Sequence, residues 1–142
     1  MKKYFTGLEK VYQKLEVTDS KRKIFLPEKA VSKIVNLIFC RAKKGNNKVI
    51  FIGNGGSASI ASHIATDFLK NALVPAIAFN DSSLITCLSN DLGYEYVFEK
   101  PLEILAKRGD ILFSVSSSGM SKNILNATIK AKEKGCFIIT LS

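Results

Sequence analysis

The fold of this chain is indicated by residues 49–59, which read Val49-Ile50-Phe51-Ile52-Gly53-Asn54-Gly55-Gly56-Ser57-Ala58-Ser59. The first four residues form a continuous apolar run that ends at a glycine, as is typical of a buried parallel strand. The glycines that follow allow a tight turn and a close approach of the backbone to a ligand. A helical stretch from about residue 57 to residue 70 comes next, so its free N–H groups and the positive end of its dipole face that turn. The stretch therefore predicts a strand–loop–helix unit with a ligand site in its loop.

The same alternation continues to the end of the sequence. Further strands are predicted at residues 75–79, 110–115 and 136–141, and residues 80–83 have the composition of a turn and helix cap. Residues 94–106 have a helical pattern in which Pro101 marks a break or a start, and a last helix runs from Ser121 to Lys134 and closes at Gly135. We predict an α/β fold, a three-layer αβα domain with a parallel, flavodoxin-like sheet. Because Ser142 directly follows a strand, we also expect that a C-terminal part is missing.

The residues before position 49 have the sequence pattern of helices. Apolar residues recur at helical spacing at Tyr4, Leu8, Val11, Tyr12 and Leu15, and the polar residues 18–23 interrupt this pattern. A second helix with a wide apolar arc begins at Pro27 and indicates packing on the following domain, a subunit interface, or both. A cluster of turn-forming residues at 44–47 separates this helical segment from the alternating strands and helices that follow. We therefore predict an N-terminal helical segment over residues 1–45, for packing or oligomerisation, and a ligand-binding domain over residues 46–142.

Composition narrows the class of protein. The net charge of +9 arises entirely within residues 1–48, interleaved with apolar residues, which favours solvated helix faces over a nucleic-acid surface. The sequence has no apolar run long enough to span a membrane and no secretory signal at its start. Three scattered cysteines, Cys40, Cys87 and Cys136, indicate reduced core thiols of a cytoplasmic protein. We expect neither nucleic acid nor membrane as a partner.

A second polar loop follows the predicted strand at residues 110–115. It reads Ser116-Ser117-Ser118-Gly119-Met120-Ser121 and again opens a helix, so hydroxyls and free N–H groups make a neutral nest for a phosphate monoester. The alternative is that both loops are turn and cap chemistry alone, but two such loops after two apolar strands disfavour it. Neither loop has the third glycine of a dinucleotide site or the lysine of a nucleoside-triphosphate site. The expected ligand is therefore a smaller phosphorylated metabolite.

His63 and Asp67 stand four residues apart on one face of the helix that follows the first loop. One interpretation is a hydrogen-bonded pair on the helix surface. The other is a catalytic or metal-binding pair, because a bound metabolite that exchanges a proton needs a nearby base.

These blocks together resemble a known family. Residues 53–58 with His63, then Asn90-Asp91-Leu92-Gly93-Tyr94, then residues 116–121 are similar to the sugar isomerase (SIS) domain family, and within it to the phosphoheptose isomerases. The resemblance covers residues 48–142 and, more loosely, the N-terminal helices.

The resemblance implies roles for particular residues. It implies substrate contacts at Asn54, Gly55, Gly56 and Ser57, sugar contacts at Asn90 and Asp91, and phosphate binding at Ser116, Ser117, Ser118 and Ser121. It makes His63 a zinc ligand and Asp67 a ligand or base, so that zinc is the expected cofactor. Two departures stand out. Asp67 occupies the position of a longer glutamate, and the family's further Gln or Glu and His on a C-terminal helix have no counterpart here.

The expected function is that of a phosphosugar isomerase, which converts sedoheptulose 7-phosphate to an aldose heptose 7-phosphate by a proton shift through an enediol. Heptose and cell-surface polysaccharide synthesis is the implied pathway, and a homotetramer or homodimer the implied assembly. The alternative is a non-catalytic SIS protein that senses a sugar phosphate or binds a replication initiator. A nucleic-acid binder rests on charge alone.

Overall fold

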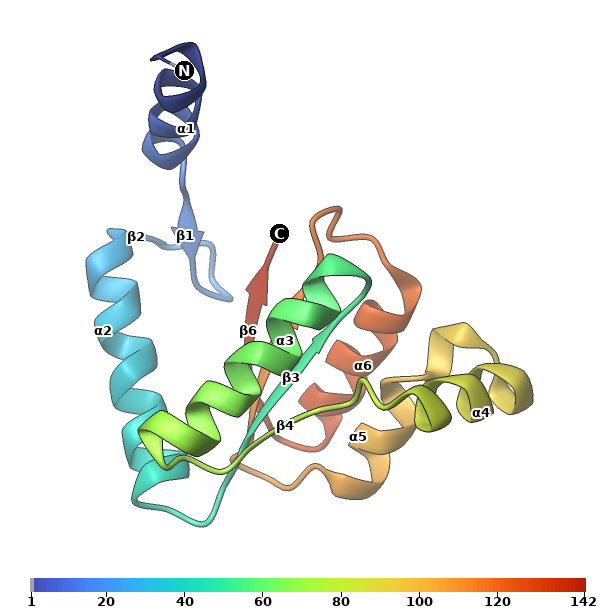
Figure 1. The fold of residues 1–142 in the computed structure, drawn as a ribbon. Coiled ribbons are helices and arrows are strands. Elements are labelled where there is room, and N and C mark those ends of the chain that lie inside the picture. The colour runs from blue at the N-terminus through green and yellow to red at the C-terminus, as the bar shows by residue number, and fades with distance from the viewer. Residues whose placement is uncertain (1) are drawn as a thin grey trace. The chain divides into compact units, whose positions relative to one another are not determined.

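The computed structural model describes residues 2–142 of the chain, and it forms two compact units, Met1–Leu37 and Ile38–Ser142 (Figure 1). The side chains of residues 2–5 and 8 are outside this description, and the predicted apolar positions Tyr4 and Leu8 lie among them. The domain boundary between residues 45 and 46 that the sequence indicates stays a prediction. The two compact units of the structure divide between Leu37 and Ile38.

The first unit contains two helices and a small hairpin. Helix α1 is Lys2–Gln13, strands β1 (Val17–Thr18) and β2 (Ile24–Phe25) pair antiparallel, and helix α2 is Pro27–Ile38. The Asp19 carboxylate accepts hydrogen bonds from the backbone N–H groups of Lys21 and Lys23, at 2.8 and 3.0 Å, and this closes the hairpin turn. Residues 19–23 of the polar stretch thus form a turn between two short strands that the sequence did not predict, and Thr18 belongs to the first of these strands. Helix α2 starts at Pro27 as predicted.

The second unit is built on a four-stranded parallel sheet. Its strands are β3 (Val49–Gly53), β4 (Ala76–Ala78), β5 (Ile111–Val115) and β6 (Phe137–Leu141), in the spatial order β4-β3-β5-β6. The first strand of the unit therefore lies between the second and the third, which is the flavodoxin-like order. The predicted fold class is confirmed, and all four predicted strands are present.

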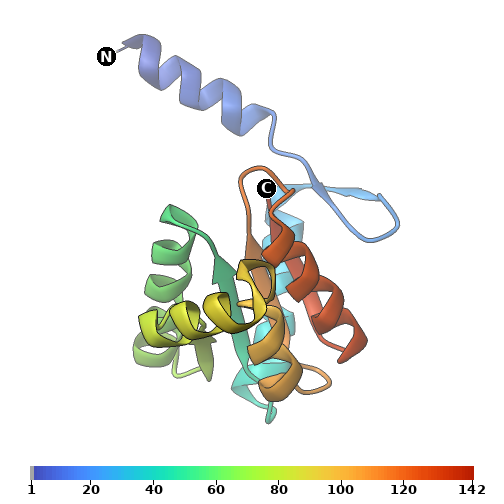
Figure 2. The same ribbon diagram turned by 90° about the vertical axis from the view of Figure 1, so that its right-hand side faces the viewer.

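Helices cover both faces of this sheet. Helix α3 (Gly56–Asp67) packs against β3 and β4 on one face, and helices α5 (Glu99–Leu105) and α6 (Lys122–Glu133) pack together on the other (Figures 1 and 2). Because side chains alternate along a strand, Phe51 and Phe113 lie toward α3, and their rings stack at 5.0 Å between centroids. The ring of Phe68, which follows α3, packs on Phe51 edge-on at 5.3 Å.

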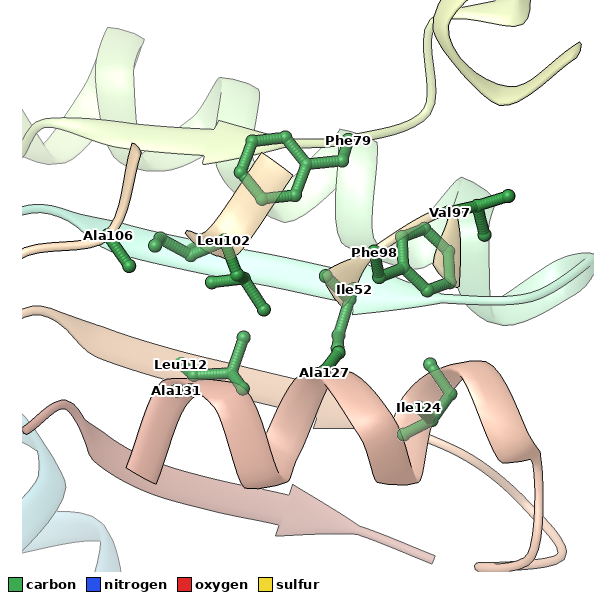
Figure 3. Close-up of a cluster of buried hydrophobic side chains, with 11 residues drawn as sticks. Ile52, Phe79, Val97, Phe98, Leu102, Ala106, Leu112, Ile124, Ala127 and Ala131 are labelled. Carbon is green, nitrogen blue, oxygen red and sulfur yellow. The ribbon is translucent and has the colours of Figure 1, made fainter. Parts of the chain in front are cut away.

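The alternate side chains of the same strands form the hydrophobic core. Ile50 and Ile52 of β3 and Leu112 of β5 meet one face of α6 in a fully buried cluster (Figure 3). The remaining members of this cluster are Phe79, Val97, Phe98, Leu102, Ala106, Ile124, Ala127 and Ala131. Small residues at 127 and 131, one turn apart on α6, allow that helix to lie close to the sheet. The core thus fixes the positions of the strand ends and of the helix that starts beside them.

An ion pair joins β3 and β5 at their amino ends. Asp110, only 1% exposed, accepts hydrogen bonds from Lys48 Nζ at 2.5 Å and from the backbone N–H groups of Lys48 and Lys107 at 3.0 and 2.9 Å. The Asn47 side chain adds a fourth donor at 3.2 Å. Burial alone would raise the pKa of Asp110, but these hydrogen bonds outweigh it, and the pKa lies below its ordinary value. The buried carboxylate is therefore charged and aligns the starts of the two strands.

Several local details confirm or refine the sequence predictions, and the helix cap expected within residues 80–83 is present. Helix α4 (Ser82–Leu92) is capped by Asp81, whose carboxylate accepts from Leu84 N at 3.0 Å. The predicted helix at 94–106 consists of a 3-10 turn, η3 (Tyr94–Tyr96), followed by α5, in whose first turn Pro101 lies. Helices α2 and α3 continue as π-helical turns, η1 (Phe39–Lys43) and η2 (Phe68–Ala72). Within residues 2–142, no helix combines the length and the apolar character needed to cross a membrane.

The prediction about the cysteines is partly wrong. All three are free thiols, but Cys40 and Cys87 are exposed and only Cys136 is partly buried. Burial, together with the negative charge of Asp110, raises the pKa of the Cys136 thiol. The apolar neighbours of Cys40 and Cys87 in the sequence lie on helices with one exposed face, so apolar surroundings in sequence did not imply burial.

Candidate functional site

The two polar loops leave the sheet side by side. Strands β3 and β5 are hydrogen-bonded neighbours, and their last residues, Gly53 and Val115, are partners in the register. The loop Asn54–Ser57 follows Gly53, and the loop Ser116–Ser121 follows Val115. Each loop enters a helix, α3 or α6, whose amino end therefore lies at the carboxyl edge of the sheet.

The first loop depends on glycine for two separate reasons. Gly55 has φ +53° and ψ −122°, a conformation that side chains with a Cβ rarely adopt. A Cβ on Gly53 would meet Ser57 O at 2.7 Å, because the start of α3 folds back against the end of β3. By contrast, a Cβ on Gly56 would meet nothing within 4 Å. The turn is thus open around the Cβ position of Gly56 and closely packed around that of Gly53.

The second loop is held by its own hydroxyls and backbone. Ser116 is buried and its Oγ lies 3.4 Å from Ser121 Oγ, while Ser118 Oγ accepts from Met120 N at 3.2 Å. Ser121 stands at the start of α6 without a side-chain capping bond, and the N–H of Ile124 already donates to Ser121 O at 3.0 Å, so the N–H groups of Lys122 and Asn123 are the ones that can bind a ligand. Ser117 and Ser118 are exposed. The loop therefore combines a fixed base with free donors, which suits an anion.

A pair of asparagine side chains connects the two loops directly. Asn54 Nδ2 donates to Asn123 Oδ1 at 3.0 Å, and Asn123 Nδ2 donates to Asn54 Oδ1 at 2.8 Å. Asn123 belongs to the first turn of α6 and is only 2% exposed. A third segment joins at the same atom, because the Tyr94 hydroxyl donates to Asn54 Oδ1 at 3.0 Å. Three sequence blocks that lie far apart along the chain thus meet at Asn54.

Asn54 also lines a surface hollow of about 260 Å³ at this edge of the sheet. Its wall is formed by the first loop, the start of α4 and Tyr94; the lining residues are Gly53, Asn54, Gly55, Ala58, Asn80, Ser82, Ile85, Thr86 and Tyr94. Asn80 fixes the far side, since its Nδ2 donates to Ala58 O at 2.8 Å and to Ser62 Oγ at 2.9 Å. The lining combines apolar side chains with a few polar ones, as in small-molecule sites.

The predicted sugar contacts Asn90 and Asp91 lie at the end of α4 and do not line this hollow. Asn90 Nδ2 donates to Asp91 Oδ1 at 2.8 Å, and both residues are exposed. The hydrogen bond and the charge of Asp91 raise the pKa of the nearby Cys87 thiol. Of the Asn90–Tyr94 block, Tyr94 is the residue that contacts the first loop.

His63 and Asp67 form the pair expected from their spacing. His63 Nε2 lies 3.4 Å from Asp67 Oδ2, and their side chains are 78% and 49% exposed. Asn71 Nδ2 donates to Asp67 Oδ1 at 3.1 Å. From the rise per residue, His63 stands about 10 Å and Asp67 about 16 Å along α3 from its first residue. The pair is therefore separate from the two loops and lies farther along the same helix.

The donor set of this pair does not by itself fit a zinc site. A catalytic zinc ion is normally held by three protein ligands, and His63 and Asp67 supply two. Within residues 2–142, no three His, Cys, Asp or Glu side chains are grouped so that they could share a metal ion. Zinc at this pair stays a prediction, because a zinc ion there requires at least one further ligand.

Asn123 and Tyr94 were not assigned roles from the sequence, although a signal existed for the first. Asn123 lies four and eight residues before Ala127 and Ala131, so it shares their buried face of α6. A polar side chain on a buried helix face requires a hydrogen-bond partner. For Tyr94 the sequence offered no such signal, because an exposed tyrosine after a glycine has many possible positions.

Comparison with known proteins places these features in a family. The sequence model of the SIS domain matches residues 12–142. The chain is 41% identical over 134 residues to a phosphoheptose isomerase of Haemophilus ducreyi, which covers 89% of this chain and 69% of that one. It is 38% identical over 149 residues to the phosphoheptose isomerase of Sulfurimonas denitrificans, with coverages of 99% and 74%.

Solved structures show the same relationship. A phosphoheptose isomerase from Francisella tularensis matches with a TM-score of 0.75 and 31% identity, over 82% of this chain and 63% of that chain. One from Neisseria gonorrhoeae matches with a TM-score of 0.68 and 31% identity, over 78% and 58%. Across these four comparisons the match covers between 58% and 74% of the relative's own length.

Proposed function

The chain belongs to the SIS domain family, and from this membership and the geometry of the two loops we propose that it is a phosphosugar isomerase that acts on sedoheptulose 7-phosphate. The observation that carries the proposal is the convergence at the register partners Gly53 and Val115. Two helix starts with free N–H groups and hydroxyls lie there next to each other and are linked through Asn54 and Asn123. The names of the relatives, phosphoheptose isomerases, support the choice of substrate.

In this proposal the loops hold the phosphate and the hollow holds part of the sugar. The N–H groups of Gly55 and Gly56 and the hydroxyls of Ser116, Ser117, Ser118 and Ser121 bind the dianion through hydrogen bonds, without a lysine. The reacting carbons of a seven-carbon sugar 7-phosphate are at the opposite end from the phosphate. A substrate that extends along α3 brings them toward His63 and Asp67, which lie farther down that helix.

The chemistry is a 1,2-proton shift. The Asp67 carboxylate takes a proton from carbon 1 while a water molecule gives one to the oxygen on carbon 2, and this gives an enediol and a hydroxide ion. The hydroxide ion then takes the proton of the hydroxyl on carbon 1 and becomes water again, while the proton held by Asp67 goes to carbon 2, so that the ketose becomes an aldose. His63, 3.4 Å from Asp67, orients the carboxylate. Asp67 is thus proposed as the base and His63 as its positioning partner.

A non-catalytic protein that binds a sugar phosphate is the second candidate. It is favoured by the high exposure of His63 and Asp67, since a general base usually works in a site that excludes water. The two candidates share the loops and differ at this pair. An assay that detects the aldose formed when the chain is incubated with sedoheptulose 7-phosphate separates the two candidates.

We also propose a homo-oligomer, in which exposed apolar residues of α2 form the contact. Val31 and Val35 lie one turn apart on that helix and are 58% and 56% exposed. Replacing both with serine should leave a monomer in analytical ultracentrifugation if this face is the interface.

Ligand protection tests the loop assignment. Sedoheptulose 7-phosphate should raise the thermal midpoint of the chain, because a ligand that binds the folded state stabilises it. Ser117→Asp should abolish that protection, since it places a negative charge among the donors. Asn46→Asp is the matched control, because it adds the same charge on an exposed turn at the opposite end of β3. Equal protection of the Ser117→Asp variant and the parent would remove the serine loop from the site.

A further inference from the structure

The Tyr94 hydroxyl lies in the wall of the hollow, and its hydrogen already forms a hydrogen bond to Asn54. It is 3.0 Å from Asn54 Oδ1, and Tyr94 and Asn54 both line the 260 Å³ hollow. The side chain is half exposed, so the hydroxyl is accessible from that space. The question is which hydrogen-bonding role this hydroxyl offers to a ligand.

The backbone of α6 determines the answer. The N–H of Ile124, which can only donate, contacts Asn123 Oδ1 at 3.0 Å, so this atom of Asn123 must be the carbonyl oxygen. The Asn54 group that faces Asn123 Oδ1, at 3.0 Å, is therefore its amide nitrogen, and the group that faces Asn123 Nδ2, at 2.8 Å, is its oxygen. The orientations of both amides follow from one backbone donor.

The chain of hydrogen bonds ends at Tyr94. Because Asn54 Oδ1 can only accept, the Tyr94 hydroxyl must donate its single hydrogen to it. Both lone pairs of Asn54 Oδ1 are then used, one by Asn123 and one by Tyr94. Toward the hollow, the Tyr94 oxygen presents lone pairs alone, while Asn54 offers its second amide N–H. The two side chains thus differ in what they can recognise.

We propose that Tyr94 is a specificity-determining residue that accepts a hydrogen bond from one hydroxyl of the sugar. This inference rests on the proposed function and adds to it the direction of one hydrogen bond, from the sugar to Tyr94. A ligand group that can only accept, such as a carbonyl or a phosphate oxygen, is disfavoured against Tyr94. A hydroxyl is favoured, because it can donate to Tyr94 and still accept from another group.

The test compares the full chain with its Tyr94→Phe variant in calorimetric binding of sedoheptulose 7-phosphate, of its monodeoxy analogues and of inorganic phosphate. Loss of one neutral hydrogen bond should weaken binding of the sugar phosphate about threefold to tenfold. Inorganic phosphate should bind both proteins equally, because Asn54 loses its bond to Tyr94 but keeps both of its bonds to Asn123, which link the two loops. One monodeoxy analogue, the one that lacks the hydroxyl read by Tyr94, should also bind both proteins equally.

Tyr96→Phe is the matched control. Tyr96 belongs to the same 3-10 turn and lines a different hollow, with Leu92, Glu99, Lys100 and Glu103. This variant should bind all the ligands as the parent does. Equal affinity of Tyr94→Phe and the parent for sedoheptulose 7-phosphate would overturn the inference, and so would a parallel loss for inorganic phosphate, which indicates a structural role. If the parent chain fails to bind sedoheptulose 7-phosphate, the proposed function fails, and the inference with it.

Discussion

Replacing Asn123 with leucine should loosen the link between the two loops and lower both stability and affinity. The change keeps the approximate size of the side chain and removes both bonds to Asn54, at 3.0 and 2.8 Å. In the parent, the backbone N–H of Ile124 donates to both Asn123 Oδ1 and Ser121 O. The variant keeps the bond to Ser121 O, at 3.0 Å, so this N–H is not left without a partner. Asn54 is left with one partner, Tyr94.

The expected magnitude follows from these contacts. Two lost hydrogen bonds at about 0.5–1.5 kcal/mol each amount to a decrease of about 1–3 kcal/mol in the free energy of unfolding. The leucine side chain, buried at a position that is 2% exposed, returns part of this, so we expect about 1–2 kcal/mol. Urea denaturation, with an unchanged dependence on denaturant, measures the difference.

Binding gives the second readout for this variant. Without Asn123 the orientation of Asn54 is no longer fixed, and affinity for sedoheptulose 7-phosphate should fall about tenfold, a loss of about 1.4 kcal/mol. Asn126→Leu serves as the control, because Asn126 lies on the same helix and bonds the backbone of Glu95 instead, at 3.2 Å. Parental stability and affinity in the Asn123→Leu variant would refute the reasoning that this amide pair holds the loops together.

Two further predictions concern the framework of the site. Asp110→Asn should lower the free energy of unfolding at pH 7 by about 3 kcal/mol, because the partly buried Lys48 loses its counter-charge. The pKa of Asp110 is lower in the folded state than in the unfolded state, where it is about 4. The ionised carboxylate therefore stabilises the fold above pH 4, and this stabilisation is lost as the pH falls through the folded-state pKa. The variant should lose less stability than the parent below pH 4, and identical acid profiles of the two proteins would contradict this. Gly53→Ala should cost about 1–3 kcal/mol in the same assay, because its Cβ would meet Ser57 O at 2.7 Å, whereas Gly56→Ala, with open space around its Cβ, should keep the parental free energy of unfolding.

The layered fold was predictable because its signals are local. The continuous apolar run at 49–52 and the largely apolar run at 111–115 lie in strands, and the glycine and serine loops after them begin helices, as expected from the sequence. The hairpin at residues 17–25 was missed because its strands are two residues long and its turn depends on the Asp19 carboxylate. Boundaries inside residues 94–106 depended on how Val97 and Phe98 pack into the core, which no local pattern records.

The candidate site was predictable as two loops but not as a network. Spacing placed His63 and Asp67 on one helix face, and the structure has them 3.4 Å apart. The connection between the loops was not visible, because Asn54 and Asn123 are 69 residues apart in sequence. Their contact depends on the register of β3 with β5 and on the depth at which α6 packs, both of which are tertiary properties.

The most direct test is a crystal structure of the chain with sedoheptulose 7-phosphate bound. We expect the phosphorus atom between the turn at Gly55–Ser57 and the serines at 116–121, within hydrogen-bond reach of N–H groups from both loops. A sugar phosphate found elsewhere on the chain, with those two turns empty, would contradict the assignment of the site.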